Sequence, residues 1–529
     1  MCSSDLATCT LYWFGRGDPA ALFDLALDAL ATNDSYVPER LLAAAYGVTM
    51  AHQLPTPEFA DALKTYLARL RDCFTGPAAT HPTSHWLTRL YAQGTVRLAK
   101  TYYPDVVPAG LEANGRIPFA PGPTVDPIPD GDPRAAEIDR TLHMDFRNYT
   151  LGRLFRDRRN YDRSHAGHME AVAHVRGTVW VLGWREAELG AVDATLRSNA
   201  SSHEAARTER YGKKYGWVGF YTHAGRLNDD GRFPADRRGL PEVDIDPSFP
   251  ERPPPVPIAV PIWARPTPAD DRRWIRHGIV TVPDELLRRP DIGPHPGPWI
   301  AVHGHLNADD QSPRRRVFGL LMALLVKDAD ADRLVDAVRA RHYPGNDWLP
   351  QQPPMDIYTF AGEIPWSPDF ARDDPDGDAA AERYRYPVSV ENGSPIEVEI
   401  LAHEYVWESY HSALNQAHGA LIPSRPFSDA FGLRGMPQTF NQALPDGTVT
   451  AVSLRGPAGL SGQLLYLRED LVHRYAAGRQ LLWFMWGERQ LLPPEFPPPR
   501  WLSRVYDDGA HIWRHIRRGE ELFPPFASH

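Results

Sequence analysis

The chain has 529 residues, of which 42% are hydrophobic and 11% aromatic, so we expect a globular protein of about two to four domains. A formal net charge of −10 argues against binding of nucleic acid or anionic membrane over the whole surface. Three cysteines exclude a disulfide framework and favour a cytoplasmic location, and no apolar run reaches the roughly eighteen residues that a membrane span needs.

The first six residues, MCSSDL, resemble the conceptual translation of a common sequencing adapter read from a GTG start. We therefore expect the native sequence to start at Ala7 and the chain to be the C-terminal part of a longer protein. The sequence upstream of residue 7 is then the missing part.

Residues 7–103 are predicted to form paired helices. Stretches at 22–29, 41–48, 59–74 and 86–98 each place apolar residues on one helical face. Thr56-Pro57-Glu58 offers an N-cap, a proline at the first helical position and an acid in the first turn. Short loops between such helices predict an α-solenoid of HEAT type, or alternatively a compact bundle. Eight prolines between 104 and 133 then predict an extended connector over 104–134.

The middle domain, 135–249, is predicted to be helical, with an amphipathic helix near 167–182 and a last helix at 207–226. Ser201 and Ser202 are candidate N-caps for that last helix. Its three glycines, Gly212, Gly216 and Gly219, lie at i, i+4 and i+7 and form one stripe. Three glycines inside a helix cost roughly 3 kcal/mol relative to alanine. We therefore expect another backbone to pack closely against this stripe.

A second proline-rich linker, 250–272, precedes a domain with a different pattern. Runs rich in β-branched and aromatic residues predict strands at 299–302, 317–327, 357–360, 396–401, 449–454 and 463–467, and short helices are predicted at 331–341 and 468–477. Because strands and helices do not alternate regularly, residues 273–529 are predicted to be an α+β domain. The whole chain is therefore expected to be mixed, with all-α helical repeats, a helical middle domain and an α+β tail.

Catalytic motifs are not evident in the sequence. Gly212-Lys213 lacks the upstream glycine and the following Ser or Thr of a Walker A loop, and there is no Gly-x-Ser-x-Gly motif. The sequence therefore favours a chain that is not an enzyme.

Basic and aromatic residues alternate between Arg147 and Lys214, a composition that can hold a nucleic-acid backbone and stack bases. Asp157 and Asp162 interrupt this run, which fits intramolecular salt bridges better. Nucleic-acid binding is thus one alternative. The residues assigned to a partner or nucleic-acid surface are Arg153, Arg156, Arg159, Arg207, Arg210, Tyr211, Lys213, Lys214 and Trp217.

Two further groups of residues suggest chemistry. His303 and His305 share one face of a predicted strand, and with Asp309 they form a legitimate metal-ligand set for a metal-dependent hydrolase. The simpler interpretation is a pair of solvated histidines at a sheet edge. Glu404 and Glu408 share a face if HEYVWESYH is helical, but acid/base catalysis would need one of them to be buried, and a solvated or capping role is simpler.

Several short segments resemble one family. They are DF at 145–146, YTLG at 149–152, ERYGKKY at 209–215 with Trp217, NDSYVPER at 33–40, AYG at 45–47, WESY at 407–410, and LLW at 481–483 with GE at 487–488. Together they resemble the C-terminal region of very large bacterial ATP-binding proteins, which carry an N-terminal P-loop NTPase of STAND or NACHT type.

The resemblance implies a role in antiviral defence, because several such proteins belong to antiphage systems such as AVAST. In those systems helical repeats recognise a phage protein and the upstream NTPase responds. It implies a protein partner, no cofactor in this chain, and ATP with Mg²⁺ only in the missing NTPase. The family supplies no catalytic residues that could be assigned here.

Overall fold

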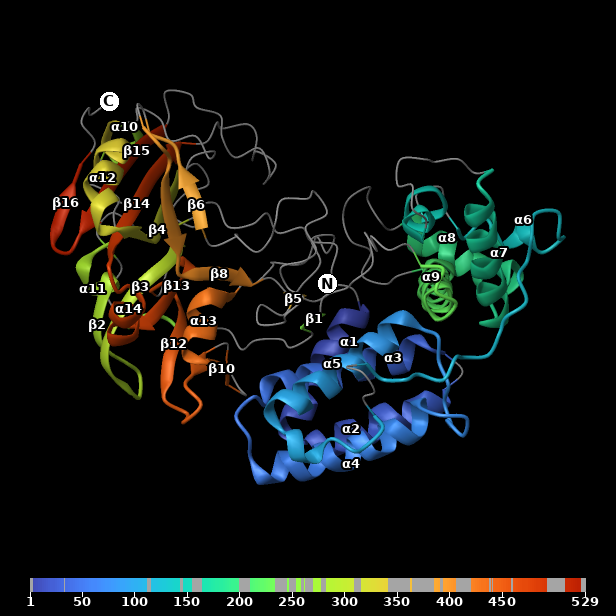
Figure 1. The fold of residues 1–529 in the computed structure, drawn as a ribbon. Coiled ribbons are helices and arrows are strands. Elements are labelled where there is room, and N and C mark those ends of the chain that lie inside the picture. The colour runs from blue at the N-terminus through green and yellow to red at the C-terminus, as the bar shows by residue number, and fades with distance from the viewer. Residues whose placement is uncertain are drawn as a thin grey trace. The chain divides into compact units, whose positions relative to one another are not determined.

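The computed structural model describes residues 3–32, 34–111, 116–142, 146–154, 164–198, 210–233, 245–246, 254–257, 261, 270–276, 282–308, 315–340, 362–363, 385–390, 393–405, 420–436, 439, 441–457, 460–491 and 510–524. The chain divides into two compact units: the first holds Met1–Phe249, Asp356–Asp378 and Val406–His418, and the second holds Pro250–Met355, Ala379–Tyr405 and Gly419–His529. The first unit is mainly helical, and the second contains a large antiparallel sheet (Figure 1). The expectation of a mixed chain is confirmed.

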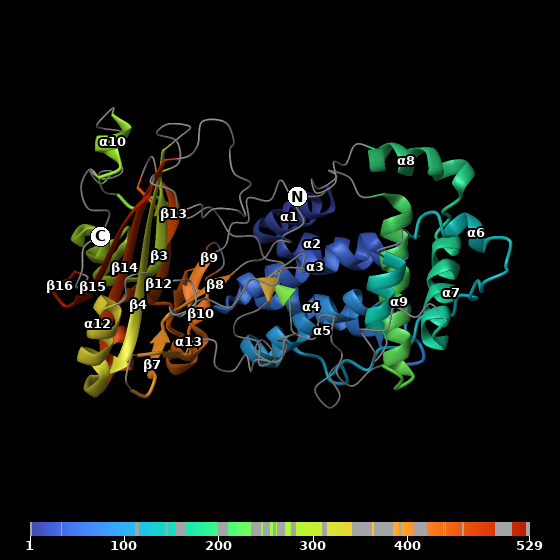
Figure 2. The ribbon, with the colours of Figure 1, turned by 90° about the horizontal axis from the view of Figure 1, so that it is seen from above.

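The first unit begins with five helices: α1 (Ser3–Gly17), α2 (Pro19–Asp28), α3 (Tyr36–Ala51), α4 (Pro57–Phe74) and α5 (Trp86–Tyr102). Helix α3 lies between α1 and α5, while α2 packs on α4 (Figure 2). A glycine allows α5 to approach α3, because a Cβ at Gly94 would lie 2.6 Å from the Tyr46 ring. The predicted cap of α4 is confirmed, since the Thr56 hydroxyl accepts the Phe59 N–H at 3.4 Å.

Four more α-helices follow in the described part of the first unit: α6 (Ala135–Ile138), α7 (Ala166–Val181), α8 (Ala191–Ser198) and α9 (Tyr211–Asp229). Helix α7 confirms the position of the helix expected near 167–182, but its buried residues are not confined to one face, so it is not amphipathic as expected. Helix α9 contacts α5 and α7, and Figure 2 shows it in green between them. The helices α1, α3, α5, α9 and α7 thus contact one another in series. A two-stranded ladder pairs β1 (Ile245–Asp246) with β5 (Gly362–Glu363).

The glycine stripe of α9 is closely packed, but another backbone approaches it only at Gly219, so the expectation of a backbone along the whole stripe is confirmed at one glycine of three. A Cβ at Gly219 would lie 3.1 Å from the backbone Cα of Val175 on α7. At Gly212 and Gly216 the neighbours are side chains, with Thr141 at 2.4 Å and Leu142 at 3.2 Å. The closest approach is at a glycine outside the stripe. A Cβ at Gly225 would lie 1.8 Å from the carbonyl oxygen of Ser84.

The second unit contains a twelve-stranded antiparallel sheet. Its main path runs β10 (Arg434–Gly435), β11 (Gln442–Ala443), β12 (Val449–Arg455), β13 (Ser461–Arg468), β3 (His295–Asn307), β4 (Arg315–Lys327), β14 (Arg479–Leu491), β15 (Ala510–Arg518) and β16 (Glu521–Phe523). Off this path, β2 (Arg288–Ile292) pairs with β3, and β7 (Ile396–Ile400) pairs with β4 and with β6 (Arg385–Val388). The remaining elements are the β8–β9 pair (Ala402–Tyr405, Ala420–Pro423) and the short helices α10 (Asp271–Trp274), α11 (Asp284–Leu287), α12 (Ala331–Ala340), α13 (Arg425–Phe431) and α14 (Glu469–Tyr475).

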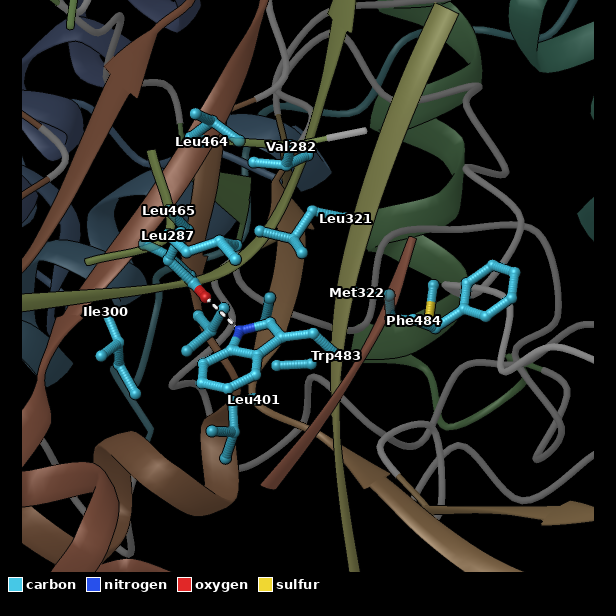
Figure 3. Packing of buried hydrophobic residues seen from close by; sticks show 14 of the residues in the cluster. Val282, Leu287, Ile300, Leu321, Met322, Leu401, Leu464, Leu465, Trp483 and Phe484 are labelled. Atoms are coloured by element: carbon cyan, nitrogen blue, oxygen red, sulfur yellow. Dashed lines mark hydrogen bonds between the residues drawn. The ribbon is translucent and has the colours of Figure 1, made fainter. Parts of the chain in front are cut away.

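The sheet divides where β3 separates from β4. Strand β4 pairs with β3 through Phe318–Met322 and then, on the same edge, with β7 through Leu324–Val326. At this division the Trp483 indole of β14 donates its N–H to the Ala301 carbonyl at 2.9 Å. Figure 3 shows the indole among Leu287, Leu321 and Leu401. The hydrogen bond satisfies a buried carbonyl at the place where the two strands part.

Most sequence-predicted strands of the second unit lie within observed strands, namely β3, β4, β7, β12 and β13, and the two predicted helices correspond to α12 and α14. Residues 357–360 lie outside the described residues.

The helical interpretation of HEYVWESYH is wrong at its start, because His403 and Glu404 belong to strand β8. Glu408 lies outside the described residues, so the i, i+4 carboxylate pair has no support. Strand β14 was not predicted at all.

Candidate functional site around helix α9

The N-terminus of α9 is capped by an aspartate from another helix. Asp193 of α8, which is 7% exposed, accepts the backbone N–H groups of Tyr211 at 2.8 Å and Gly212 at 2.9 Å. The same carboxylate accepts the indole N–H of Trp184 at 3.1 Å. A carboxylate at this position satisfies unpaired amides and interacts favourably with the helix dipole. The sequence-based cap at Ser201 and Ser202 lies outside the described residues, and α9 begins at Tyr211 rather than near Arg207.

Near its N-terminus, α9 is joined by an ion pair to the turn that precedes α3. The Lys214 ammonium lies 2.7 Å from Asp34 Oδ2, and the two side chains are 19% and 30% exposed. The same ammonium lies 4.7 Å from the centre of the Tyr36 ring. The other Asp34 oxygen accepts the Tyr36 N–H at 3.0 Å and fixes the turn before α3. Two segments that are about 180 residues apart, NDSYVPER and ERYGKKY, therefore meet here.

A second ion pair joins the C-terminal end of α9 to α5. The Arg89 guanidinium binds both carboxylate oxygens of Asp229, at 2.5 Å and 2.8 Å, and its Nε donates to the Thr83 carbonyl at 2.6 Å. This two-point geometry is the stronger form of an arginine–carboxylate pair. The Ser84 carbonyl that approaches Gly225 is in the same loop. Helix α9 is thus held near both ends by residues of the N-terminal helices.

Between α3 and α5 lies a buried group of charged side chains. Glu39 is 2% exposed and accepts two hydrogen bonds from Arg40, at 3.1 Å and 2.6 Å. His85 Nε2 lies 3.6 Å from the other Glu39 oxygen, and His85 Nδ1 accepts the Thr88 N–H at 3.3 Å as the N-cap of α5. Burial lowers the pKa of His85, and Glu39 partly opposes that shift. Because the imidazole is 3% exposed and caps a helix, we interpret this group as structural.

The sequence-predicted surface residues are only partly gathered together. Arg210, Tyr211, Lys213, Lys214 and Trp217 lie at the start of α9, and Tyr211 is 40% exposed. Lys214 faces Asp34, whereas the Trp217 ring packs edge-on against Phe146 at 5.1 Å. The backbone of Arg153 lies in the short helix Leu151–Leu154. Its side chain, and all of Arg156, Arg159 and Arg207, lie outside the described residues.

The basic run before α7 also takes part in intramolecular ion pairs. Arg147 lies 2.8 Å from Asp139 Oδ2, and Arg176 of α7, which is 1% exposed, binds the same carboxylate and Asp130. The Arg176 guanidinium holds the pKa of Asp130 below its ordinary value. At Arg147, the only member of the run whose side chain is described, the structure agrees with the salt-bridge interpretation of the sequence.

The candidate metal ligands His303 and His305 lie on β3, opposite Met322 and Leu320 of β4. Burial, and then the neighbouring His305, lower the pKa of His303 to about 3, and burial lowers that of His305. Both rings are therefore neutral at pH 7. Within the described ranges no three His, Cys, Asp or Glu residues are placed to hold a metal ion, and Asp309 lies outside those ranges. The metal site stays an untested alternative.

The residues that organise α9 were mostly missed by sequence reasoning. Asp34 was noted only as part of the resembling segment NDSYVPER, and Asp193 and Asp229 were not singled out. The sequence does not show which acid meets which base.

Comparisons with known proteins add no family to this description. None of the helices in the described residues combines the length and the apolar composition that a membrane span requires. No protein-family model matches the chain, and no curated protein matches it either.

Proposed function

We propose that this chain is a non-catalytic sensor or regulatory region of a larger bacterial P-loop NTPase, that it acts in the cytoplasm in antiphage defence, and that it binds a protein partner. The observation that carries the proposal is the serial contact of α1, α3, α5, α9 and α7, with α2 and α4 packed beside the first three. Helices that each contact mainly their neighbours form an extended surface suited to a macromolecular partner. This arrangement supports HEAT-like repeats over 7–103.

The resemblance of the α3 and α9 segments to large ATP-binding proteins supports the same proposal. The two segments come from separate parts of the sequence, yet Lys214 and Asp34 join them. This contact places the two resembling segments in one structural unit. It also assigns Lys214 a role within the molecule.

A protein partner is favoured over nucleic acid by the state of the basic residues. Lys214 pairs with Asp34, and Arg147 pairs with Asp139. A cation already paired with a carboxylate contributes less to counterion release, which drives binding to phosphate backbones. We therefore expect no retention of labelled single-stranded DNA, duplex DNA or RNA at about 50 mM salt. Salt-dependent retention that is lost in Lys213→Glu would favour the nucleic-acid alternative.

The sensor proposal is tested in cells with the complete gene, including its upstream sequence. Bacteria that carry the gene are challenged with a phage panel, and phages that escape restriction are sequenced. Escape mutations are expected to fall in one phage protein, which the purified chain then binds in calorimetry. The proposal is wrong if the upstream sequence encodes no P-loop NTPase, if no phage is restricted, or if the purified chain alone turns over ATP.

A further inference from the structure

Two histidines stack on each other where α7 crosses α9. The rings of His174 on α7 and His223 on α9 have centroids 4.7 Å apart and planes inclined by 20°. His223 is 4% exposed. The crossing is tight at this level, because Gly219, one turn before His223, approaches the backbone of Val175, the residue after His174. Any change in the distance between these rings therefore changes the packing of the two helices.

Both imidazoles have a buried Nδ1 atom without a hydrogen-bond partner in the described part of the chain. The stacked geometry argues against a shared metal ion as the explanation. Ring-nitrogen lone pairs lie in the ring planes, and two nearly parallel planes do not direct their lone pairs to one point about 2 Å from each nitrogen. What the geometry favours is a pair of neutral rings in apolar contact.

The charged groups around His174 and His223 carry a net positive charge. On α7, Glu170 lies one turn before His174, but its carboxylate binds Arg232 at 2.8 Å and 2.6 Å. On α9, Arg226 lies three residues after His223 and donates to the Pro123 carbonyl. Protonation of both rings would place two further positive charges beside two arginines and one carboxylate.

The pKa values follow from this environment. Burial lowers the pKa of His223 to about 4, with further lowering by His174, Arg226 and Arg232 and a partial opposing effect of Glu170. Burial and Arg226 lower the pKa of His174. Because the pKa is lower in the packed state, the contribution of the neutral rings to the stability of the α7–α9 contact is fully present above the ordinary pKa of 6.5. This contribution is lost as the pH falls towards 4.

We propose that the His174–His223 pair is a proton-operated contact, in which protonation of the stacked rings separates α7 from α9. Acidification then frees Gly219 of α9 from Val175 of α7, while the ion pairs of Lys214 and Arg89 still hold α9 to the N-terminal helices. The contact makes the connection between the N-terminal helices and α7 dependent on pH. This inference does not depend on the identity of any partner.

The test is hydrogen exchange of the full chain, measured by mass spectrometry between pH 7.5 and pH 5 and corrected for the intrinsic rate at each pH. A pKa of 6.5 in the open state and about 4 in the packed state predicts that His223 alone raises the opening constant about 30-fold over this interval. Peptides from α7 and α9 are expected to lose protection accordingly. Peptides from β12 of the second unit serve as the internal control, because neither β12 nor its partner strands β11 and β13 contain a histidine.

Two variants separate this effect from general acid sensitivity. The double variant His174→Phe/His223→Phe keeps stacked aromatic rings that cannot take up a proton, and its α7 and α9 protection is expected to be the same at both pH values. The single variant His223→Asn, which replaces less volume, is expected to lose most of the 30-fold change. The proposal is overturned if wild-type protection is independent of pH, or if His223→Asn or the double variant shows the full wild-type loss.

Discussion

Helix α9 in the first unit and strand β14 in the second each contact neighbours on both sides, but different chemistry holds them. Helix α9 packs through glycines, and carboxylates at both ends hold it by ion pairs and hydrogen bonds. Strand β14 pairs with β4 over its whole length and fills the core with Trp483, Phe484 and Met485. At α9 the absence of side chains on the glycines allows neighbouring residues to approach closely. At β14 large side chains make the packing contacts.

This difference determines how each region responds to change. A core filled by large side chains loses stability when a side chain is removed, because burial is lost and a cavity remains. A contact made through glycine loses stability when a side chain is added, because no space exists for it. Ion pairs add smaller energies that depend on salt and pH. The following experiments test these expectations, beginning with the largest expected effect.

Removing the indole of Trp483 should give the largest effect. We expect Trp483→Ala to destabilise the second unit by about 4 kcal/mol, because burial is lost and the Ala301 carbonyl loses its donor. Trp483→Phe keeps most of the buried area and should cost about half as much. Urea unfolding followed by pulsed hydrogen exchange reports each unit separately. Equal effects of the two variants would contradict a space-filling role for the indole.

Adding one methyl group to α9 should cause the second-largest loss of stability. In Gly225→Ala the new Cβ would lie 1.8 Å from the Ser84 carbonyl, so the α5–α9 contact must open, at a cost of about 3 kcal/mol. Gly17→Ala, at the end of α1, is the matched control because its Cβ meets nothing within 4 Å. That variant should be neutral or slightly stabilising. The same unfolding measurement applies, and similar results for both glycines would contradict close packing at Gly225.

Removing the cap of α9 should have a smaller effect. Asp193→Ala leaves the amides of Tyr211 and Gly212 and the Trp184 indole without their acceptor, and we expect a cost of about 2 kcal/mol. Asp193→Asn retains one carbonyl acceptor and should fall between wild type and Asp193→Ala. Amide exchange in the first turn of α9 is the measurement. Unchanged exchange in Asp193→Ala would show that the cap is dispensable.

The Lys214–Asp34 ion pair should contribute least. Both side chains are partly exposed, so we expect a coupling energy of about 1 kcal/mol in a double-mutant cycle of Lys214→Met and Asp34→Asn. Screening should reduce the coupling at high salt. Urea unfolding of the four proteins at low and high salt measures it. Zero coupling at low salt would remove the energetic link between α3 and α9.

Local sequence patterns predicted several elements because each pattern has a local cause. Thr56 and Pro57 start α4 since a cap and a first-turn proline act within one helical turn. The glycine stripe of α9 indicated close packing because the energetic cost of glycine in a helix is a property of that segment alone. Strand β14 was missed for an equally physical reason. Its core, LWFMW at 482–486, is buried on both faces, so the alternation that marks a half-buried strand is absent.

The sequence by itself determined that the chain is mixed, that helices come first and strands later, and that the residues around Gly216 must pack closely. Only the tertiary structure decided the partners: Asp193 as the cap of α9, Asp34 for Lys214, Ser84 against Gly225 and His174 against His223. Helix and strand preferences arise within a few residues and can be recognised locally. Pairings between residues many positions apart depend on which surfaces meet when the helices and strands pack.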